Sequence, residues 1–336
     1  MSVVYRYAFT KQLALNIASD YFKDQLKRTD MFAANFANPT RDNFLENIAL
    51  QFRKRAFEID GQLLLSSINE KVTNGAAAHD FTELSPALSA SFQPVAKLPL
   101  HIRASYKSIF RAPSFDDLYY TNIGNTALVP EYVKQYNLGV TLNSHVGNWI
   151  PELFCSVDAY YSDVKDKIIA VPRQNLFQWS MLNIGKADIK GIDVATHINF
   201  KHWGPLLLSV NCSYSFQHSL DLTDPSAVGY KAQLPYVPEH SGTVNLNISI
   251  RKLRISYNMI SSAYRYRLGE QIPENRVQGW ATHDVVLNYS LDASKRSAYS
   301  IIAEFNNIYN KGYEVIKYYP MPGFNFRIGM SATFKK

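Results

Sequence analysis

Arginine and tyrosine side chains that could bind an anion are concentrated at three places in this sequence. Arginine presents a planar fork of N–H donors that matches carboxylates and other anions, and tyrosine adds a flat stacking surface with a polar tip. The same side chains could instead form an interfacial aromatic belt with arginines bound to lipid headgroups. We expect contacts with a small-molecule ligand from these residues: Arg111, Tyr119, Tyr120 and Asn122; Tyr264, Arg265, Tyr266, Arg267 and Arg276; and Tyr318 and Tyr319.

Residues for catalysis or metal binding are not arranged in a recognisable pattern. The eight histidines are scattered, and neither a paired-histidine zinc motif nor a nucleophilic serine motif occurs. We therefore expect no enzyme activity, no metal site and no cofactor. Cys155 and Cys212 fall in apolar phases of strands that we place two apart, so we expect no disulfide between them.

The elements that must position these side chains are β-strands. From Phe324 to Phe334, apolar residues occupy every even position, and polar residues or glycine occupy every odd one. Because alternate side chains of a strand point to opposite faces, such a segment has one apolar and one polar face. The pattern recurs in Leu208–Phe216 and Val244–Ile250 over roughly 8–11 residues, the length that a tilted strand needs to cross a bilayer.

Connections between the strands alternate between short and long. Short ones fall at 54–55, 94–97, 144–148, 201–204, 251–252 and 292–296. Long ones fall at 24–42, 111–130, 166–184, 220–236, 267–279 and 310–321, and one near 72–79 is intermediate. This alternation predicts an all-β fold, an antiparallel up-and-down transmembrane β-barrel domain over residues 1–336 with about fourteen strands.

Composition agrees with this class. Charged residues make up 19% of the 336 residues, below the roughly 25% of soluble domains. No apolar run is long enough for a transmembrane helix. Trp149 and Trp203 flank short connections and Trp280 closes a long one, as an interfacial aromatic belt requires, whereas Trp179 falls in an expected long loop. The net charge of +7 is dispersed, so we expect no nucleic-acid partner.

Six segments of the second two-thirds of the chain form an ordered set of motifs. They are Phe110–Tyr119 (FRAPSFDDLY), Gly124–Glu131 (GNTALVPE), Asn183–Asp193 (NIGKADIKGID), Leu234–His240 (LPYVPEH), Asn306–Glu314 (NNIYNKGYE) and Pro320–Gly323 (PMPG). In sequence and in order these segments resemble the barrel of TonB-dependent outer-membrane transporters. Two departures are Phe324, where the family's closing motif has arginine, and the two lysines after Phe334.

The resemblance implies the last part of a 22-stranded barrel whose lumen an N-terminal plug closes, in the bacterial outer membrane. It implies energised uptake of a scarce, bulky ligand such as an iron–siderophore complex or cobalamin. The implied partners are outer-membrane lipid, the barrel-assembly machinery and, only if a plug and a coupling motif lie upstream, an inner-membrane energy-coupling complex. The first residues do not resemble a signal peptide, and no plug is seen, so we expect a truncated portion of such a protein.

Two alternatives stay open at this point. A self-contained smaller barrel of about fourteen strands would act as a passive or gated channel. A soluble glycan-binding β-sandwich would bury the apolar strand faces against each other.

Overall fold

The computed structural model describes residues 1–29, 36–120, 123–172, 179–291 and 297–334. In this part of the chain, one antiparallel sheet contains fifteen strands, one more than the sequence analysis counts, and each main strand pairs with its neighbour in sequence. The strands are β1 (Ser2–Ala8), β2 (Leu13–Gln25), β3 (Thr40–Lys54), β4 (Phe57–Lys71), β5 (Phe81–Phe92), β6 (Leu100–Arg111), β7 (Glu131–Val146), β8 (Ile150–Pro172), β9 (Trp179–Asn199), β10 (Leu206–Asp221), β11 (His240–Ile250), β12 (Leu253–Ser262), β15 (Trp280–Ser290), β16 (Ser297–Asn306) and β19 (Asn325–Phe334).

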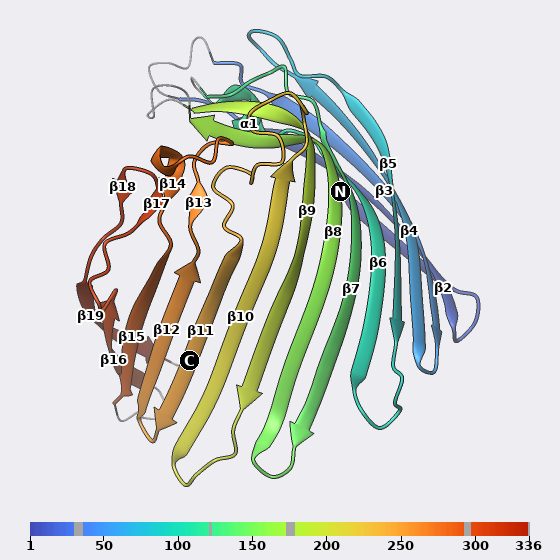
Figure 1. Cartoon of the computed structure of the whole chain (residues 1–336). Coiled ribbons are helices and arrows are strands. Elements are labelled where there is room, and N and C mark those ends of the chain that lie inside the picture. Colours follow the sequence, from blue (N-terminus) through green and yellow to red (C-terminus); the bar gives the residue numbers. More distant parts are fainter. Residues whose placement is uncertain (30–35, 121–122, 173–178, 292–296, 335–336) are drawn as a thin grey trace.

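The smaller elements lie in the long connections. They are α1 (Phe115–Tyr119), the two-stranded ribbon β13 (Arg265–Tyr266) with β14 (Arg276–Val277), the 3-10 helix η2 (Pro273–Asn275), and the ribbon β17 (Glu314–Ile316) with β18 (Tyr319–Pro320). Figure 1 shows them at one end of the strands, with the short turns at the other end. Apart from the connection between β8 and β9, short and long connections alternate as the sequence predicts, which is the pattern of an up-and-down barrel wall.

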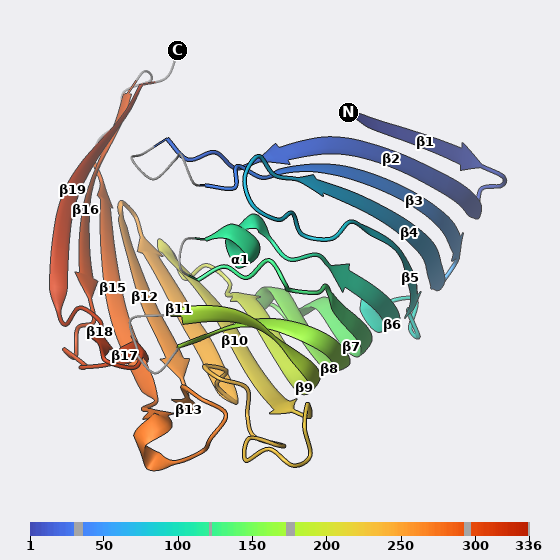
Figure 2. The ribbon, with the colours of Figure 1, turned by 90° about the horizontal axis from the view of Figure 1, so that it is seen from above.

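The sheet curls into a wall that is open on one side. Seen from above, β1 and β19 lie at its two free edges, and α1 lies inside the curve (Figure 2). Within the described residues β1 pairs only with β2, and β19 only with β16. The all-β antiparallel barrel class is therefore confirmed, as an incompletely closed wall.

The two faces of the wall differ as the alternation predicts. Leu138 and Val140 on β7 and Ile328 and Met330 on β19 are exposed apolar side chains of the outward phase. Residues of the other phase line hollows on the inner side: Asn137 and Gly139 on β7, and Ser331 and Thr333 on β19. No second sheet covers the apolar face in the described part of the chain, so a β-sandwich is excluded.

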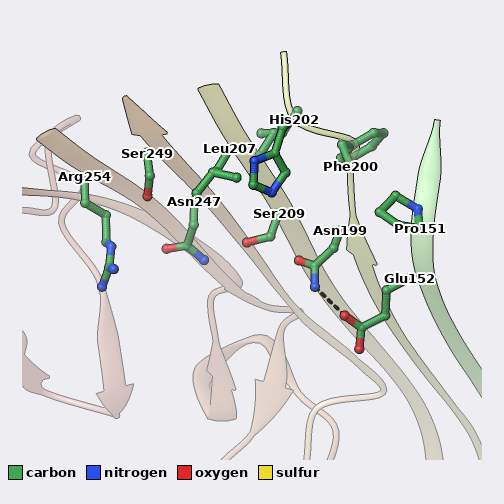
Figure 3. A pocket seen from close by; sticks show the side chains of 11 residues that line it. Pro151, Glu152, Asn199, Phe200, His202, Leu207, Ser209, Asn247, Ser249 and Arg254 are labelled. Carbon is green, nitrogen blue, oxygen red and sulfur yellow. Dashed lines mark hydrogen bonds between the residues drawn. The ribbon is translucent and has the colours of Figure 1, made fainter. Parts of the chain in front are cut away.

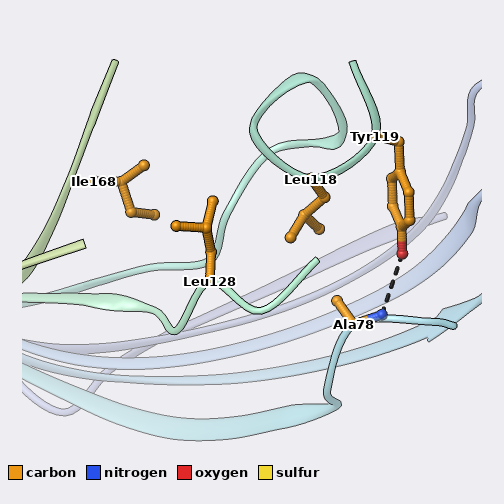
Figure 4. Close-up of a cluster of buried hydrophobic side chains, with 5 residues drawn as sticks. All are labelled: Ala78, Leu118, Tyr119, Leu128 and Ile168. Atoms are coloured by element: carbon orange, nitrogen blue, oxygen red, sulfur yellow. Dashed lines mark hydrogen bonds between the residues drawn. The ribbon is translucent and has the colours of Figure 1, made fainter. Parts of the chain in front are cut away.

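The expectation of a long loop at residues 166–184 is wrong for most of that range, and residues 173–178 lie outside the described residues. Residues 166–172 and 179–184 continue β8 and β9 rather than forming part of a loop, and Trp179 begins β9. The reason is packing, because Ile168 of the extended β8 is buried against Leu118 and Leu128 in a cluster that includes Ala78 and Tyr119 (Figure 4). The burial of this apolar surface favours the longer hairpin.

Two further expectations concern particular side chains. Cys155 on β8 and Cys212 on β10 are both free thiols with β9 between their strands, as predicted. The rings of Trp149 and Trp203 lie 6.3 Å apart at the short-turn end, where the aromatic belt is expected.

No helix in the described residues is both long and apolar enough to span a membrane.

Candidate functional site

The predicted ligand-contacting residues fall into two separate groups. Arg111, Tyr119 and Tyr120 lie at and around α1, while Asn122 lies outside the described residues. The remaining residues lie in or next to the strands of the two ribbons at the long-loop end: Tyr264, Arg265, Tyr266, Arg267, Arg276, Tyr318 and Tyr319. The structure thus brings together residues from two connections that are about fifty positions apart in sequence.

The first ribbon is held by an asparagine that the sequence analysis does not select. Asn275 is 2% exposed, and its Nδ2 donates to the carbonyl of Glu270 at 2.9 Å. The backbone N–H of Arg267 donates to the Asn275 carbonyl, and Arg267 Nε donates to Asn275 Oδ1 at 2.9 Å. Asn275 therefore fixes both the loop and the direction of the Arg267 guanidinium.

The second ribbon turns through Lys317 and Tyr318. Tyr318 has a φ of 68°, in the left-handed region that tyrosine rarely adopts, and its N–H donates to Glu314 Oε2 at 3.1 Å. Arg265 joins the two ribbons, because its Nη2 donates to the carbonyls of Glu314 and Val315. The turn thereby holds Tyr318 in an exposed position beside the first ribbon.

Cations lie over the faces of two exposed tyrosines. The Arg276 guanidinium is 4.2 Å from the ring centroid of Tyr264. Arg267 and the ammonium of Lys317 are 5.9 Å and 5.5 Å from the ring centroid of Tyr318. We call Tyr264, Arg265, Arg267, Arg276, Lys317 and Tyr318 the cation–tyrosine cluster; a ring face with a cation above it suits an anionic or aromatic ligand.

Arg265 gives this cluster a buried positive charge. The residue is 4% exposed, and its Nη1 has no hydrogen-bond partner in the described part of the chain. Burial lowers the pKa of the Arg265 guanidinium from its ordinary value, yet arginine remains charged at neutral pH. The described residues provide Arg265 with no carboxylate ion pair, so its charge adds to the positive field of the cluster.

The α1 segment is held by a different kind of network. Tyr119 is buried; its hydroxyl donates to Glu70 Oε1 and accepts from the N–H of Ala78 at 3.1 Å. Arg41 Nη2 lies 2.5 Å from Glu70 Oε2 and donates to the carbonyl of Pro113 at 2.8 Å. Burial, reinforced by the Glu70 hydrogen bond, raises the pKa of Tyr119 to about 12.

Arg111, at the start of the same segment, forms ion pairs with two carboxylates. Its guanidinium lies 3.0 Å from Asp117 and 3.4 Å from Glu131, and Lys167 also lies 3.6 Å from Glu131. Asp117 reaches back to the N–H of Ser114 in a capping box that begins α1. Tyr120, the C-cap of α1, is 57% exposed and so is accessible to a ligand.

Three residues that hold the ribbons in place were not among the predicted ligand-contacting residues. Lys317 donates to the Arg276 carbonyl at 2.7 Å, Asn275 orients Arg267, and Tyr236 donates its backbone N–H to the Tyr266 carbonyl at 2.7 Å. The position of Lys317 immediately before Tyr318 and Tyr319 could have identified it. No sequence signal distinguishes Asn275 or Tyr236, because their roles depend on how the loops meet.

The inner wall is polar along its length. At the short-turn end, a hollow of about 660 Å³ receives Asn247, Ser249 and Arg254, and Asn199 donates to Glu152 at 2.6 Å (Figure 3). Arg103 and Asp158 form a 2.7 Å ion pair further along the wall. Among the described residues, no cluster of histidine, cysteine, aspartate and glutamate is arranged to hold a metal ion.

The ion pair between Arg103 and Asp158 requires a glycine at position 139. Arg103 lies opposite Gly139, which in turn lies opposite Asp158 on the next strand. A Cβ on Gly139 would lie only 2.0 Å from Asp158 Oδ1, so a larger residue would displace the carboxylate. Gly139 therefore allows the ion pair to bridge across an intervening strand.

Comparisons with known proteins agree with this architecture. Residues 6–308 match the family model described as TonB dependent receptor-like, beta-barrel. The vitamin B12 transporter BtuB of Vibrio vulnificus is 24% identical over 182 residues, covering 54% of this chain and 27% of that protein. A probable hemoglobin and hemoglobin-haptoglobin-binding protein of Haemophilus influenzae is 23% identical over 165 residues, covering 44% and 16%.

Solved structures share the fold over nearly the whole chain. The copper transporter OprC has a TM-score of 0.72 at 15% identity, covering 99% of this chain and 55% of that structure. The ferric citrate transporter FecA has a TM-score of 0.73 at 10% identity, covering 99% and 53%. The chain thus spans about half the length of these structures, and its match covers about a quarter of the curated vitamin B12 transporters. Because the family model covers most of the sequence and the wall has the expected strand order, the chain belongs to the TonB-dependent receptor family, within its β-barrel domain.

Proposed function

We propose that this chain is part of an outer-membrane receptor and transporter for a scarce, bulky, anionic ligand of the iron–siderophore type. The observation that carries the proposal is the cation–tyrosine cluster at the long-loop end. Arg267, Arg276 and Lys317 present positive charge beside exposed tyrosine rings, and the buried Arg265 has an Nη1 without a hydrogen-bond partner among the described residues. Anionic iron complexes fit this chemistry better than cobalamin, whose charges cancel within the complex.

Transport in this proposal requires more protein than the chain described here. A wall with free edges at β1 and β19 cannot face hydrocarbon, since unpaired backbone groups in a bilayer are costly. Further strands and a plug would close the barrel and connect it to an inner-membrane energy source. Whether the same gene also encodes a plug-like domain, a coupling motif and additional strands tests this part of the proposal.

Uptake measurements test the transport proposal. Iron-starved cells expressing the gene with its upstream region should accumulate radiolabelled iron supplied as a ferric citrate or ferric catecholate complex. Dissipating the inner-membrane proton gradient should abolish this uptake. Accumulation that is unaffected by the loss of the gradient would contradict energised transport.

The passive channel is the second candidate. Conductance of proteoliposomes containing this chain alone, without an energy source, would favour it. Its support is weaker, because β1 and β19 do not pair with each other within the described sheet.

The membrane location can be tested with two adjacent residues of β11. Leu246 belongs to the apolar phase, whereas Asn247 lines the inner hollow. Leu246→Arg should reduce the free energy of folding in a bilayer by about 2–4 kcal/mol, and Asn247→Arg should have a small effect. Equal losses at the two positions, measured by urea titration in lipid vesicles, would contradict a lipid-facing outer surface.

A further inference from the structure

A group of exposed lysines on three adjacent strands has no part in the proposed transport site. Lys134 lies on β7, Lys165 on β8, and Lys186 and Lys190 on β9, and all four are exposed. Strand register places Lys165 directly opposite Lys186. We call these four residues the lysine patch.

The patch lies on the outward face of the wall. Lys134 shares its phase with Tyr136 and Leu138, which are 49% and 59% exposed. The intervening residues, Gln135 and Asn137, line a hollow on the inner side instead. Since successive strand residues alternate between faces, the lysines point away from the lumen.

An aromatic belt fixes the height of the patch along the strands. The ring of Tyr136 lies 5.1 Å from that of Tyr106 and 6.3 Å from that of Tyr161. Lys190 is opposite Tyr161 in the same row, and the other three lysines lie one or two rows nearer the long-loop end. Tyrosine belts occupy the headgroup level of a membrane, so these ammonium groups lie at and just beyond that level.

The lysines are incompletely neutralised by the protein. Two carboxylates, Asp163 and Asp188, face each other in the row of Lys134, which is directly opposite Asp163. The ion pair recorded is Lys186 Nζ to Asp163 Oδ1 at 4.0 Å. Asp188 Oδ2 also accepts a hydrogen bond from the Tyr161 hydroxyl at 3.4 Å. Lys134, Lys165 and Lys190 form no ion pair within the described residues, and like charges directly opposed across two strands are unfavourable without an external anion.

We propose that the lysine patch binds the phosphate groups of anionic lipid headgroups in the outer leaflet. The proposal rests on the outer-membrane location proposed above but concerns a different surface from the ligand site. Its occupant is lipid because the patch adjoins the exposed apolar face at belt height, where a lysine can place its stem along acyl chains and its ammonium among headgroups.

Lipid retention by the full chain tests the proposal. The protein is folded in neutral detergent micelles that contain phosphorylated lipid A or the same lipid after enzymatic removal of its phosphates. Native mass spectrometry then counts the lipid molecules that remain bound. The wild-type chain should retain the phosphorylated form preferentially, and each lysine changed to glutamine in the patch should weaken retention about fivefold.

Matched variants separate this effect from general charge. Lys107 on β6 is an exposed lysine that lines the inner hollow, so Lys107→Gln should leave retention unchanged. The combination of Asp163→Asn and Asp188→Asn should strengthen retention, because it removes the internal counter-charges. Replacing all four patch lysines with arginine should preserve retention.

Three results would overturn the proposal while leaving the membrane location intact. They are equal retention of the two lipid forms by an inserted wild-type chain, unchanged retention by the glutamine variants, or an equal loss in Lys107→Gln. Absence of the wild-type protein, expressed with its upstream region, from the outer-membrane fraction of cells would overturn the location and this proposal with it.

Discussion

The α1 segment and the cation–tyrosine cluster use the same residue types in opposite electrostatic surroundings. Arg111 contacts two carboxylates, and Tyr119 is buried against Glu70. Arg267 and Arg276 instead lie over tyrosine rings. An arginine already paired with two carboxylates has little left to offer an anion, whereas one beside an exposed ring retains its charge for a ligand.

The comparison assigns different tasks to the two regions. The α1 network anchors a long connection inside the curve of the wall, and the cluster presents charge at the long-loop end (Figures 1 and 2). We therefore expect substitutions at α1 to change folding and substitutions in the cluster to change binding.

The largest expected effect comes from Glu70→Ala. The carboxylate of Glu70 is 1% exposed and holds both Arg41 and Tyr119, so its loss leaves a buried cation unpaired. Removing one partner of a buried pair costs about 3–5 kcal/mol. Amide hydrogen exchange at Leu118 and Tyr120 in α1 should accelerate by at least about a hundredfold. The control is Glu58→Ala, which breaks the exposed pair with Arg53 and should leave α1 exchange unchanged.

Arg267→Ala and Arg276→Ala should each weaken the binding of anionic ferric complexes by about tenfold, with the fold intact, because each removes a charged donor. Titration calorimetry with ferric citrate and a ferric catecholate complex measures the change. Arg276→Lys, which keeps the charge, should lose less. Unchanged affinity in both alanine variants would remove the cluster from the ligand site.

Arg111→Ala tests the α1 segment, where we expect a small loss of stability and no loss of ligand affinity. Its guanidinium is half-exposed, and Glu131 keeps Lys167 as a partner, so the cost should be at most about 1 kcal/mol. Exchange in α1 should rise a few-fold, while the affinity for ferric complexes stays at the wild-type value. A loss of affinity equal to that of Arg276→Ala would show that α1 also contacts the ligand.

The last expected effect, confined to strongly alkaline solution, is a loosening of α1. The folded structure raises the pKa of Tyr119 from 10.0 to about 12, so folding favours the protonated phenol. The stabilisation is complete below pH 10 and is lost as the pH rises from 10 to about 12. Phenolate absorbance and amide hydrogen exchange in α1, measured on the same samples, should both rise between pH 10 and about 12. Tyr119→Phe should remove the pH dependence of the exchange. Loosening at the same pH in the phenylalanine variant would assign it to another group.

Strand phase was predictable residue by residue. The alternation from Phe324 to Phe334 predicts that the apolar phase of β19 faces outward and that Ser331 and Thr333 face inward, and both of these residues line a hollow of the wall. A period of two depends only on local backbone geometry, so it can be read without knowledge of the fold. The hairpin of β8 and β9 could not be read this way, because its length depends on Ile168 packing against Leu118 and Leu128, which come from a distant connection.

The sequence by itself determined the all-β class, the alternation of connections and the residue types available to a ligand. Tertiary structure alone decided which arginines are neutralised, since Glu70 and Glu131 approach α1 from other strands, and Glu314 and Val315 offer Arg265 only carbonyls. The physical reason is that periodicity is a local property of the chain. The field at a charged side chain instead depends on every group that folding brings within a few ångströms of it.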